Sequence, residues 1–346
     1  MKCVKIAGAK MVESSTINKP VSQDGSVVIK VNSCGICGSD IHYFVSGEPK
    51  GLVMGHEFSG EVVDSGSRKD LKIGDRVTGL PISPCGECEA CKTGNPQYCA
   101  KTWLKAVGLS LTNPGAYAEY TSCRPDMVRK LPDNVSDDEA AMVEPSAVSL
   151  HAVNLADIKI GSRVLIIGGG IIGLMAAEFA KLNGATYISM LETNAKRGRK
   201  AVGFGKVDEY YDAMDTNTIG TLKTKTNGGF DVVIECCGNS AAVSEALMLV
   251  KPGGTVVLVG VSLGAVTIPT VVGVMGEVKM LGAIAYTEKE FDTCIELIAS
   301  KKINVLKYID AKVSLDEAQK SFDRLTSGKD AAVKIIFKPN LKDWFI

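Results

Sequence analysis

The sequence predicts an α/β protein with two domains, one a small β-barrel or sandwich and the other a doubly wound parallel sheet. Its 346 residues exceed the length over which one hydrophobic core usually grows, and 45% of them are hydrophobic, enough to fill two cores. Residues 26–128 contain short alternating or apolar runs separated by glycine and proline, as strands do. From residue 162, apolar runs alternate with helical segments, the pattern that builds a parallel sheet covered by helices.

Each domain can be followed along the chain. In the first, the candidate strands are VVIKV, FSGEVV, GDRVTGL and AYAEYTSC. Residues 136–158 begin with a Ser/Asp cap and keep helical spacing, so we expect a helix there that carries the chain into the second domain. In the second, the candidate strands RVLIIG, YISML, DVVIEC and TVVLVG alternate with helices that end near Lys181, Val202 and Val250.

The last part of the chain is expected to return to the first domain. It contains LGAIAY, a helix over 288–299, a short helix over 315–325 and a final strand over 333–337. We therefore place the first domain at residues 1–145 and 283–346, and the second at residues 146–282.

Charge and hydropathy narrow the classes of partner. The chain has 39 basic and 39 acidic side chains, so it offers no electrostatic footprint for nucleic acid or for an acidic membrane surface. Residues 1–20 lack the long apolar core of a signal peptide, and the longest apolar stretch, 164–180, is interrupted by glycines and is no membrane span. We expect a cytoplasmic protein that acts on a small, weakly charged molecule.

Four cysteines within fifteen residues have the spacing C-x2-C-x2-C-x7-C, which allows four thiolates to surround one zinc ion. They are Cys85, Cys88, Cys91 and Cys99. A site with four protein ligands has no open position, so this quartet predicts a structural zinc. The alternative, a surface disulfide cluster, is disfavoured in a reducing compartment.

A G-x-G-x-x-G pattern directly follows a β-branched run and directly precedes a helical one. Its glycines allow a tight turn, close approach of a pyrophosphate and close helix packing. Glu192 ends the next strand, nineteen residues after Gly173, where a carboxylate would accept the ribose hydroxyls of NAD. Basic residues from Lys196 to Lys200 could instead bind the 2′-phosphate of NADP. They fall at the start of a helix, where basic side chains are commonly solvated, so NADP is the less favoured cofactor. The predicted cofactor-binding residues are Gly168, Gly170, Ile171, Ile172, Gly173, Glu192 and Arg197.

A second metal site is suggested by Cys37 in GICGSD and by the pair His56-Glu57. A thiolate, an imidazole and a carboxylate brought together by the barrel could hold zinc with a position left open for a substrate oxygen. A His-Glu pair can also be an ordinary polar pair. Cys34 makes a C-x2-C with Cys37, but a disulfide there would consume the proposed zinc thiolate.

The motifs GICGSDIHYF, GHEFSGEVV, the cysteine quartet, VEPSAVSLHA and the glycine pattern follow the order seen in zinc-dependent medium-chain alcohol dehydrogenases. The chain resembles this family over nearly its whole length. It is most similar to the polyol branch, which includes sorbitol, galactitol-1-phosphate, butanediol and threonine dehydrogenases, because Glu144-Pro145 matches the glutamate of that branch. The resemblance implies a GroES-like barrel domain and a Rossmann domain.

The resemblance also implies roles for residues of the second site. Cys37 and His56 would ligate a catalytic zinc, Glu57 would be a direct or exchangeable ligand, and Glu144 would bind directly or through water. Ser39 and His42 stand where the family places its proton relay. Asp40 would orient His56, since a zinc-bound imidazole usually donates its other N–H to a carboxylate.

The implied activity is reversible oxidation of a secondary alcohol to a ketone, with one catalytic and one structural zinc per chain and with NAD as hydride acceptor. The substrate would be a polyol, a sugar alcohol phosphate or a vicinal diol. Sorbitol is disfavoured as the substrate, because Ala285-Tyr286 stands where sorbitol dehydrogenases carry Arg-Tyr. The resemblance implies a homodimer or homotetramer. Two alternatives are a non-catalytic zinc-bearing binding or regulatory module and a zinc-free reductase of the same fold.

Overall fold

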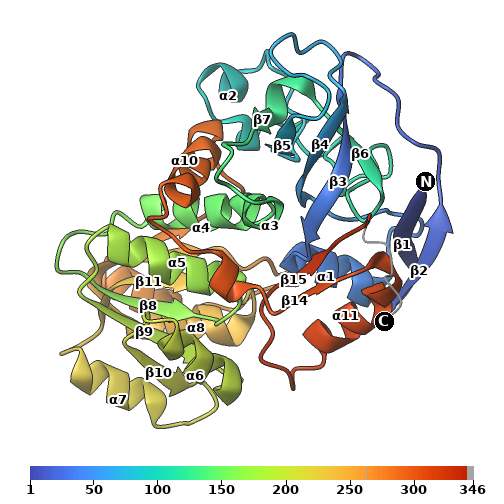
Figure 1. Ribbon diagram of the computed structural model, residues 1–346. Coiled ribbons are helices and arrows are strands. Elements are labelled where there is room, and N and C mark those ends of the chain that lie inside the picture. Colours follow the sequence, from blue (N-terminus) through green and yellow to red (C-terminus); the bar gives the residue numbers. More distant parts are fainter. Residues whose placement is uncertain (263, 341–346) are drawn as a thin grey trace. The chain divides into compact units, whose positions relative to one another are not determined.

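The computed structural model describes residues 1–262 and 264–340, and the chain forms two compact units (Figure 1). The described residues of the first unit are Met1–Pro145, Thr287–Ser327 and Lys334–Asn340. The second contains Ser146–Tyr286 and Gly328–Val333. The boundary predicted after residue 145 coincides with this division. Residues 283–286 and 328–333, however, belong to the second unit rather than to the first.

The first unit is built on a seven-stranded, mainly antiparallel sheet with the order β14-β15-β3-β4-β5-β7, and β6 pairs with β3. Only β14 and β15 pair in parallel. The candidate strands of the sequence correspond to β3, β4, β5 and β6. The bounds are β3 (Val27–Gly35), β4 (Glu57–Asp64), β5 (Arg76–Gly79), β6 (Tyr120–Cys123), β7 (Val128–Lys130), β14 (Ala311–Val313) and β15 (Ile335–Phe337).

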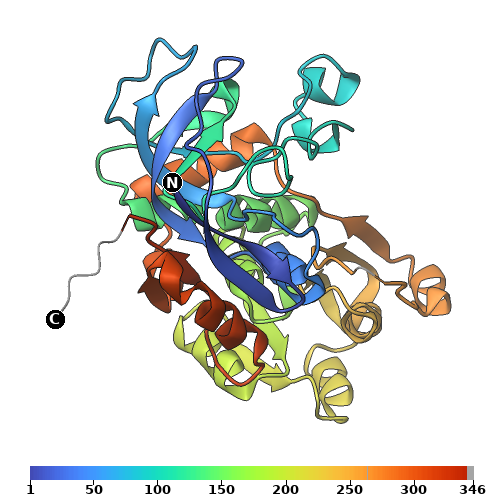
Figure 2. The ribbon, with the colours of Figure 1, turned by 90° about the vertical axis from the view of Figure 1, so that its right-hand side faces the viewer.

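In the first unit, the N-terminal hairpin packs against a helix from the C-terminal part of the chain. A hairpin of β1 (Lys2–Gly8) and β2 (Met11–Thr16) packs beside α11 (Ala318–Thr326), as Figure 2 shows. The Val12 amide donates to Gln319 Oε1 at 3.0 Å, and Gln319 Nε2 donates to the Lys10 carbonyl at 3.2 Å. The expected return of the tail to the first domain is therefore made by specific hydrogen bonds as well as by apolar packing.

An aromatic cluster anchors α1 (Gly38–Ser46) to the tail of the chain. The ring of Phe44 on α1 stacks on Phe322 of α11, with centroids 4.8 Å apart. Tyr117 meets Phe322 and Phe337 edge to face, at 6.2 and 4.9 Å. All four rings are fully buried, and such pairs add to the stabilisation from area burial. The cluster thus holds the helix that begins at Cys37 in a fixed place.

The single helix expected over residues 136–158 is two helices, α3 (Asp137–Ala140) and α4 (Val143–Leu155). Ser136 caps α3 through a reciprocal box with Glu139, in which each side chain accepts from the other residue's amide. As expected, α4 carries the chain from one unit into the other, because their boundary lies between Pro145 and Ser146.

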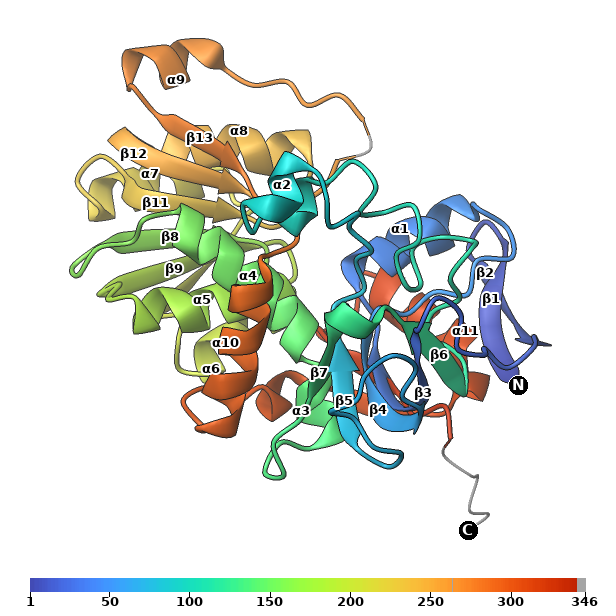
Figure 3. The same ribbon diagram turned by 90° about the horizontal axis from the view of Figure 1, so that it is seen from above.

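The second unit is a six-stranded parallel sheet with the order β10-β9-β8-β11-β12-β13 (Figure 3). Numbered from its first strand, this is the 3-2-1-4-5-6 order of dinucleotide-binding folds. The strands are β8 (Arg163–Ile167), β9 (Tyr187–Glu192), β10 (Glu209–Asp212), β11 (Phe230–Glu235), β12 (Val250–Leu258) and β13 (Lys279–Gly282). The helices are α5 (Ile171–Leu182), α6 (Ala195–Gly203), α7 (Thr218–Lys225), α8 (Ser240–Leu249) and α9 (Thr270–Met275).

Three of these elements, β10, α7 and α9, are missing from the sequence prediction. The four residues of β10 are all only half-buried, so the strand has no apolar run to reveal it. By contrast, α10 (Glu288–Ala299) has the predicted bounds, because Thr287 and Glu290 form a capping box at its start. Within residues 1–262 and 264–340, no helix is both long and apolar enough to cross a membrane.

Candidate functional site

The first ligand candidate, Cys37, is the N-cap of α1. Its amide donates to Asp40 Oδ2 at 3.0 Å, and its sulfur accepts from the Asp40 amide, so the two side chains form a reciprocal capping box. The local sequence therefore places the Cys37 sulfur at the start of α1 and orients Asp40 beside it.

His56 is buried between two side chains of α1. Its Nδ1 lies 3.6 Å from Asp40 Oδ1, and its Nε2 lies 3.5 Å from Ser39 Oγ. Neither Nδ1 nor Asp40 Oδ1 has a hydrogen-bond partner among the described residues. A small movement that brings His56 Nδ1 within hydrogen-bonding distance of Asp40 Oδ1 would commit Nδ1–H to Asp40. The lone pair of Nε2 would then be left for a metal.

The electrostatics of His56 show that the surroundings favour a cation. Burial acts to lower the pKa of His56, but the charges of Cys37 and Asp40, with a further contribution from Glu144, outweigh it and raise the pKa well above its usual range. Positive charge beside these groups is stabilised because a buried acidic cluster needs compensation.

Glu57 is held by a residue that sequence reasoning missed, Lys334. Lys334 Nζ donates to Glu57 Oε2 at 2.6 Å and to the Ile36 carbonyl at 2.8 Å, and both charged side chains are fully buried. Burial acts to lower the Lys334 pKa, but Glu57 and then Cys37 outweigh it, so the pKa is raised. The signal in the sequence was a lysine inside the apolar run of VKIIF.

The two oxygens of Glu57 have different surroundings. Oε2 is committed to Lys334, whereas Oε1 is buried without a hydrogen-bond partner among the described residues. A Cβ on Gly35 would lie 2.1 Å from Oε2, so only glycine at that position leaves room for the carboxylate. Glu57 thus has one free oxygen available for a nearby metal, as an exchangeable ligand requires.

The remaining predicted residues differ in how close they come to this group. Glu144, near the start of α4, is buried, and its charge acts on both His56 and Lys334. Ser39 is half-buried beside His56, whereas His42, one turn further along α1, is exposed. The candidate catalytic site of the first unit therefore contains Cys37, Ser39, His56, Glu57 and Glu144. His42 lies on the exposed side of α1.

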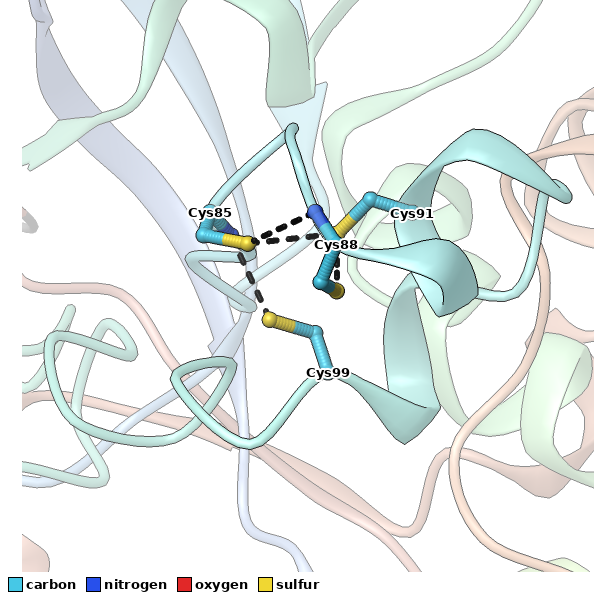
Figure 4. A group of neighbouring side chains, drawn as sticks. All are labelled: Cys85, Cys88, Cys91 and Cys99. Carbon is cyan, nitrogen blue, oxygen red and sulfur yellow. Dashed lines mark hydrogen bonds between the residues drawn. The ribbon is translucent and has the colours of Figure 1, made fainter.

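The cysteine quartet is the only group of three or more Cys, His, Asp or Glu side chains in the described residues that already has the close spacing of a metal site, and the Cys37–His56 group is less tightly gathered (Figure 4). Its four sulfurs lie within 4.8 Å of one another, and all four cysteines are free thiols. A tetrahedron with Zn–S bonds of about 2.3 Å places its sulfurs roughly 3.8 Å apart. The Cys88–Cys91 and Cys85–Cys91 distances of 3.5 and 3.9 Å fit that tetrahedron.

Backbone amides already point at the quartet. The Cys85 and Lys101 amides donate to Cys99 Sγ at 3.4 Å, and the first of these, more than the second, lowers the Cys99 pKa to about 6. Arg124, which is paired with Asp126, hydrogen-bonds to the Pro84 carbonyl just before Cys85 and so ties the loop to the end of β6. These observations fit a closed structural zinc and exclude a disulfide cluster in this structure.

The glycine pattern has the geometry that phosphate binding needs. Gly168 has φ +102°, and a Cβ on Gly173 would lie 2.0 Å from the Gly168 carbonyl, so turn and helix packing both require glycine. A Cβ on Gly170, the N-cap of α5, would meet nothing within 4 Å. Because protein packing does not explain that glycine, the open space beside it fits a bound pyrophosphate.

Glu192 lies at the end of β9, where the nucleotide pattern requires an acid. Its Oε2 accepts from the Gly169 amide at 2.7 Å, and its Oε1 accepts from the Asn194 amide at 2.8 Å. Arg197 Nη1 lies 3.7 Å from the same carboxylate. Ile171 and Ile172 form the first turn of α5.

The returning segment Gly328–Val333 also reaches this end of the sheet, which sequence reasoning did not foresee. Asn194 Nδ2 donates to the carbonyls of Gly328 and Asp330 at 3.0 Å, and Arg197 Nη2 donates to that of Ala332 at 3.4 Å. These bonds are the physical reason that the segment belongs to the second unit.

Comparison with known proteins agrees with this geometry. Residues 23–133 match the family model described as alcohol dehydrogenase GroES-like domain, and residues 172–300 match that described as zinc-binding dehydrogenase. The chain belongs to the zinc-dependent medium-chain alcohol dehydrogenases, and within them to the polyol branch. The predicted fold, a GroES-like domain and a Rossmann domain, is thereby confirmed.

Three relatives illustrate the similarity. Sorbitol dehydrogenase from Bacillus subtilis is 32% identical, with 98% of each chain covered. The structure of 2R,3R-butanediol dehydrogenase from Bacillus subtilis has a TM-score of 0.87 at 30% identity, covering 98% of this chain and 99% of the other. A zinc-binding dehydrogenase from Sinorhizobium meliloti, solved with NADP, has a TM-score of 0.85 at 31% identity, covering 98% and 99%.

Replacing one quartet cysteine tests the structural role of this site. We expect Cys99→Ser to lose one zinc per chain and to lower the melting temperature by more than about 5 °C, because the free energy of binding a structural zinc is folding free energy. Metal analysis and thermal unfolding measure the two effects. Cys294→Ala, which shortens a buried cysteine outside the quartet, is the control and should keep its full zinc content. An unchanged zinc content in Cys99→Ser would contradict the assignment.

Proposed function

We propose that the protein is a zinc-dependent, NAD-linked dehydrogenase that interconverts a secondary alcohol and its ketone. The substrate class is a polyol, a sugar alcohol phosphate or a vicinal diol. The observation that carries the proposal is the group of buried His56, Glu57 and Glu144 around half-buried Cys37, with Ser39 beside His56. Sorbitol and butanediol dehydrogenases among the relatives support the substrate class.

Each residue of the group has a proposed part. Cys37, His56 and Glu144 would hold the zinc, with Glu57 as the exchangeable fourth ligand. When bound, zinc supplies a Lewis acid that lowers the pKa of the substrate hydroxyl, and NAD supplies the hydride acceptor. Ser39 Oγ, 3.5 Å from His56 Nε2, is placed to accept the hydroxyl proton, and exposed His42 would pass it to water.

A buried ion pair restricts how Glu57 can bind a metal. The ion pair with Lys334 fixes one end of Glu57, so Glu57 reaches the metal only through Oε1. We therefore propose Glu57 as the ligand that exchanges, bound through Oε1 alone.

An assay of NAD reduction with sorbitol, galactitol-1-phosphate, butanediol and threonine tests the activity, and Cys37→Ser tests the site. With the best substrate, we expect Cys37→Ser to lower kcat/KM by about 10³-fold or more while one zinc per chain remains, because several kcal/mol of transition-state stabilisation are lost. Cys34→Ala, next to the site but outside the ligand set, should retain most of the activity.

Two outcomes would count against the proposal. If zinc-loaded protein oxidises no secondary alcohol, the non-catalytic alternative is favoured. If active protein contains one zinc per chain, held by the quartet, the zinc-free reductase is favoured.

We propose NAD rather than NADP as cofactor. Glu192 accepts two backbone amides, so its carboxylate is fixed where a 2′-phosphate would be repelled, and the nearby Arg197 guanidinium already faces that carboxylate. The similar Sinorhizobium protein was solved with NADP, so the preference of this chain is tested with both cofactors.

Glu192→Gln should lower kcat/KM for NAD and raise the ratio of NADP to NAD activity by about 10-fold, since one charge-assisted hydrogen bond and one repulsion are removed. Steady-state kinetics with both cofactors measure the ratio. Glu209→Gln, on the next strand and paired with Lys225, is the matched control and should leave the ratio unchanged. An unchanged ratio in Glu192→Gln would refute the role of this carboxylate.

We also propose a homodimer or homotetramer. The edge strand β13 is exposed along its whole length, and the neighbouring α9 exposes Val271, Val274 and Met275. An open sheet edge beside exposed apolar side chains favours pairing with a second copy.

Sedimentation velocity tests the assembly. The wild type should sediment as a dimer or larger, and Val274→Lys should shift it toward the monomer because a charge would be buried at the contact. Ile73→Lys, at an exposed apolar residue of the first unit, is the control. A monomeric wild type at micromolar concentration would rule out the proposal.

A further inference from the structure

Tyr117 occupies a central position behind the candidate catalytic zinc site, although it is not one of the proposed ligands. The side chain is fully buried, and its hydroxyl donates to Asp40 Oδ2 at 2.6 Å. The same hydroxyl lies 3.2 Å from the Gly35 carbonyl, two residues before Cys37. The tyrosine therefore contacts the carboxylate that faces His56 and the strand end that leads to the thiol ligand.

The Tyr117 ring also fixes the other ligand-bearing segment. The Tyr117 amide donates to the Met54 carbonyl at 3.0 Å, and the Ala116 amide donates to the Gly55 carbonyl at 2.8 Å. Gly55 has φ +98°, and a Cβ there would lie 2.6 Å from Tyr117 Cδ1. The residue before His56 is thus glycine partly because the tyrosine ring packs against its backbone.

The position of the Asp40 carboxylate is determined by few contacts. Oδ2 accepts from the Tyr117 hydroxyl and from the Cys37 amide, whereas Oδ1 points to His56 Nδ1 and has no hydrogen-bond partner among the described residues. Loss of the shorter of the two Oδ2 hydrogen bonds would free the carboxylate to rotate. It would then no longer hold Nδ1–H and fix which imidazole nitrogen faces the metal.

We infer that Tyr117 is a positioning residue of the catalytic zinc site, acting through Asp40 on His56 in a buried chain from Tyr117 Oη to Asp40 to His56. The inference rests on the proposed function, since it requires zinc at Cys37 and His56. It assigns to the hydroxyl, rather than to the ring, a share of the metal affinity and of the ligand orientation.

Removing only the hydroxyl tests this assignment. The ring contacts with Phe322 and Phe337 are kept in Tyr117→Phe, so the variant should fold with a wild-type circular dichroism spectrum. We expect its zinc affinity at the Cys37–His56 site, measured by competition with a chelator, to fall by about 10-fold, the lower end of the range for outer partners of ligands. The quartet should keep its zinc.

Two further measurements separate positioning from a general structural effect. With Co²⁺ at the Cys37–His56 site and zinc in the quartet, the visible absorption of Tyr117→Phe should shift, because the imidazole orientation changes. In an Asp40→Asn background, the Tyr117→Phe change should cost less than about twofold in affinity, since the partner of the hydroxyl is already altered. Tyr308→Phe, at another buried tyrosine of the first unit, is the control and should leave affinity and absorption unchanged.

The inference is overturned if Tyr117→Phe keeps the wild-type affinity and Co²⁺ absorption, or if its effect adds in full to that of Asp40→Asn. A wild type that binds no zinc beyond the quartet would overturn the proposed function together with this inference. A wild type that binds two zincs, with an unaltered Tyr117→Phe variant, would overturn this inference alone.

Discussion

Buried negative charge is the constraint on which the first unit is organised. Asp40, Glu57 and Glu144 are buried close to Cys37 and His56, and Lys334 is the one buried lysine among the described residues. One ammonium group cannot balance three carboxylates, and uncompensated buried charge is costly. The raised pKa of His56 is the local sign of this imbalance, in which neighbouring charges outweigh burial. A divalent cation at the site would supply the missing positive charge, so the burial of these acidic side chains fits a site for such an ion.

The surrounding fold supports this charged group at close range. Glycine at positions 35 and 55 leaves room for the Glu57 carboxylate and for the Tyr117 ring, and both positions lie next to ligand-bearing segments. The aromatic cluster of Phe44, Phe322 and Phe337 holds α1 against the returning tail of the chain. Rigid packing around the ligands matters because small displacements of a metal ligand change affinity and chemistry more than they change the fold.

The two cysteine-bearing sites divide structure from reactivity. The quartet gathers four sulfurs within one short loop and directs backbone amides at them, so a bound zinc has no position left for a substrate. The Cys37–His56 group is less tightly gathered, draws its side chains from distant segments, and includes a carboxylate with a free oxygen. In the second unit, the unfilled space at Gly170 and the fixed carboxylate of Glu192 provide the complementary features for a nucleotide.

What the sequence alone determined are the features encoded within short segments. The quartet, the glycine pattern and the bounds of α10 depend on residues a few positions apart, so spacing and periodicity reveal them. Only the tertiary structure decided the pairing of Lys334 with Glu57, the contact of Tyr117 with Asp40, and the return of 328–333 to the second unit. The partners are 277 positions apart for Lys334 and Glu57, 77 for Tyr117 and Asp40, and 134 for Asn194 and Gly328. No local pattern encodes such contacts, because burial and strand pairing bring these side chains together only once the chain has folded.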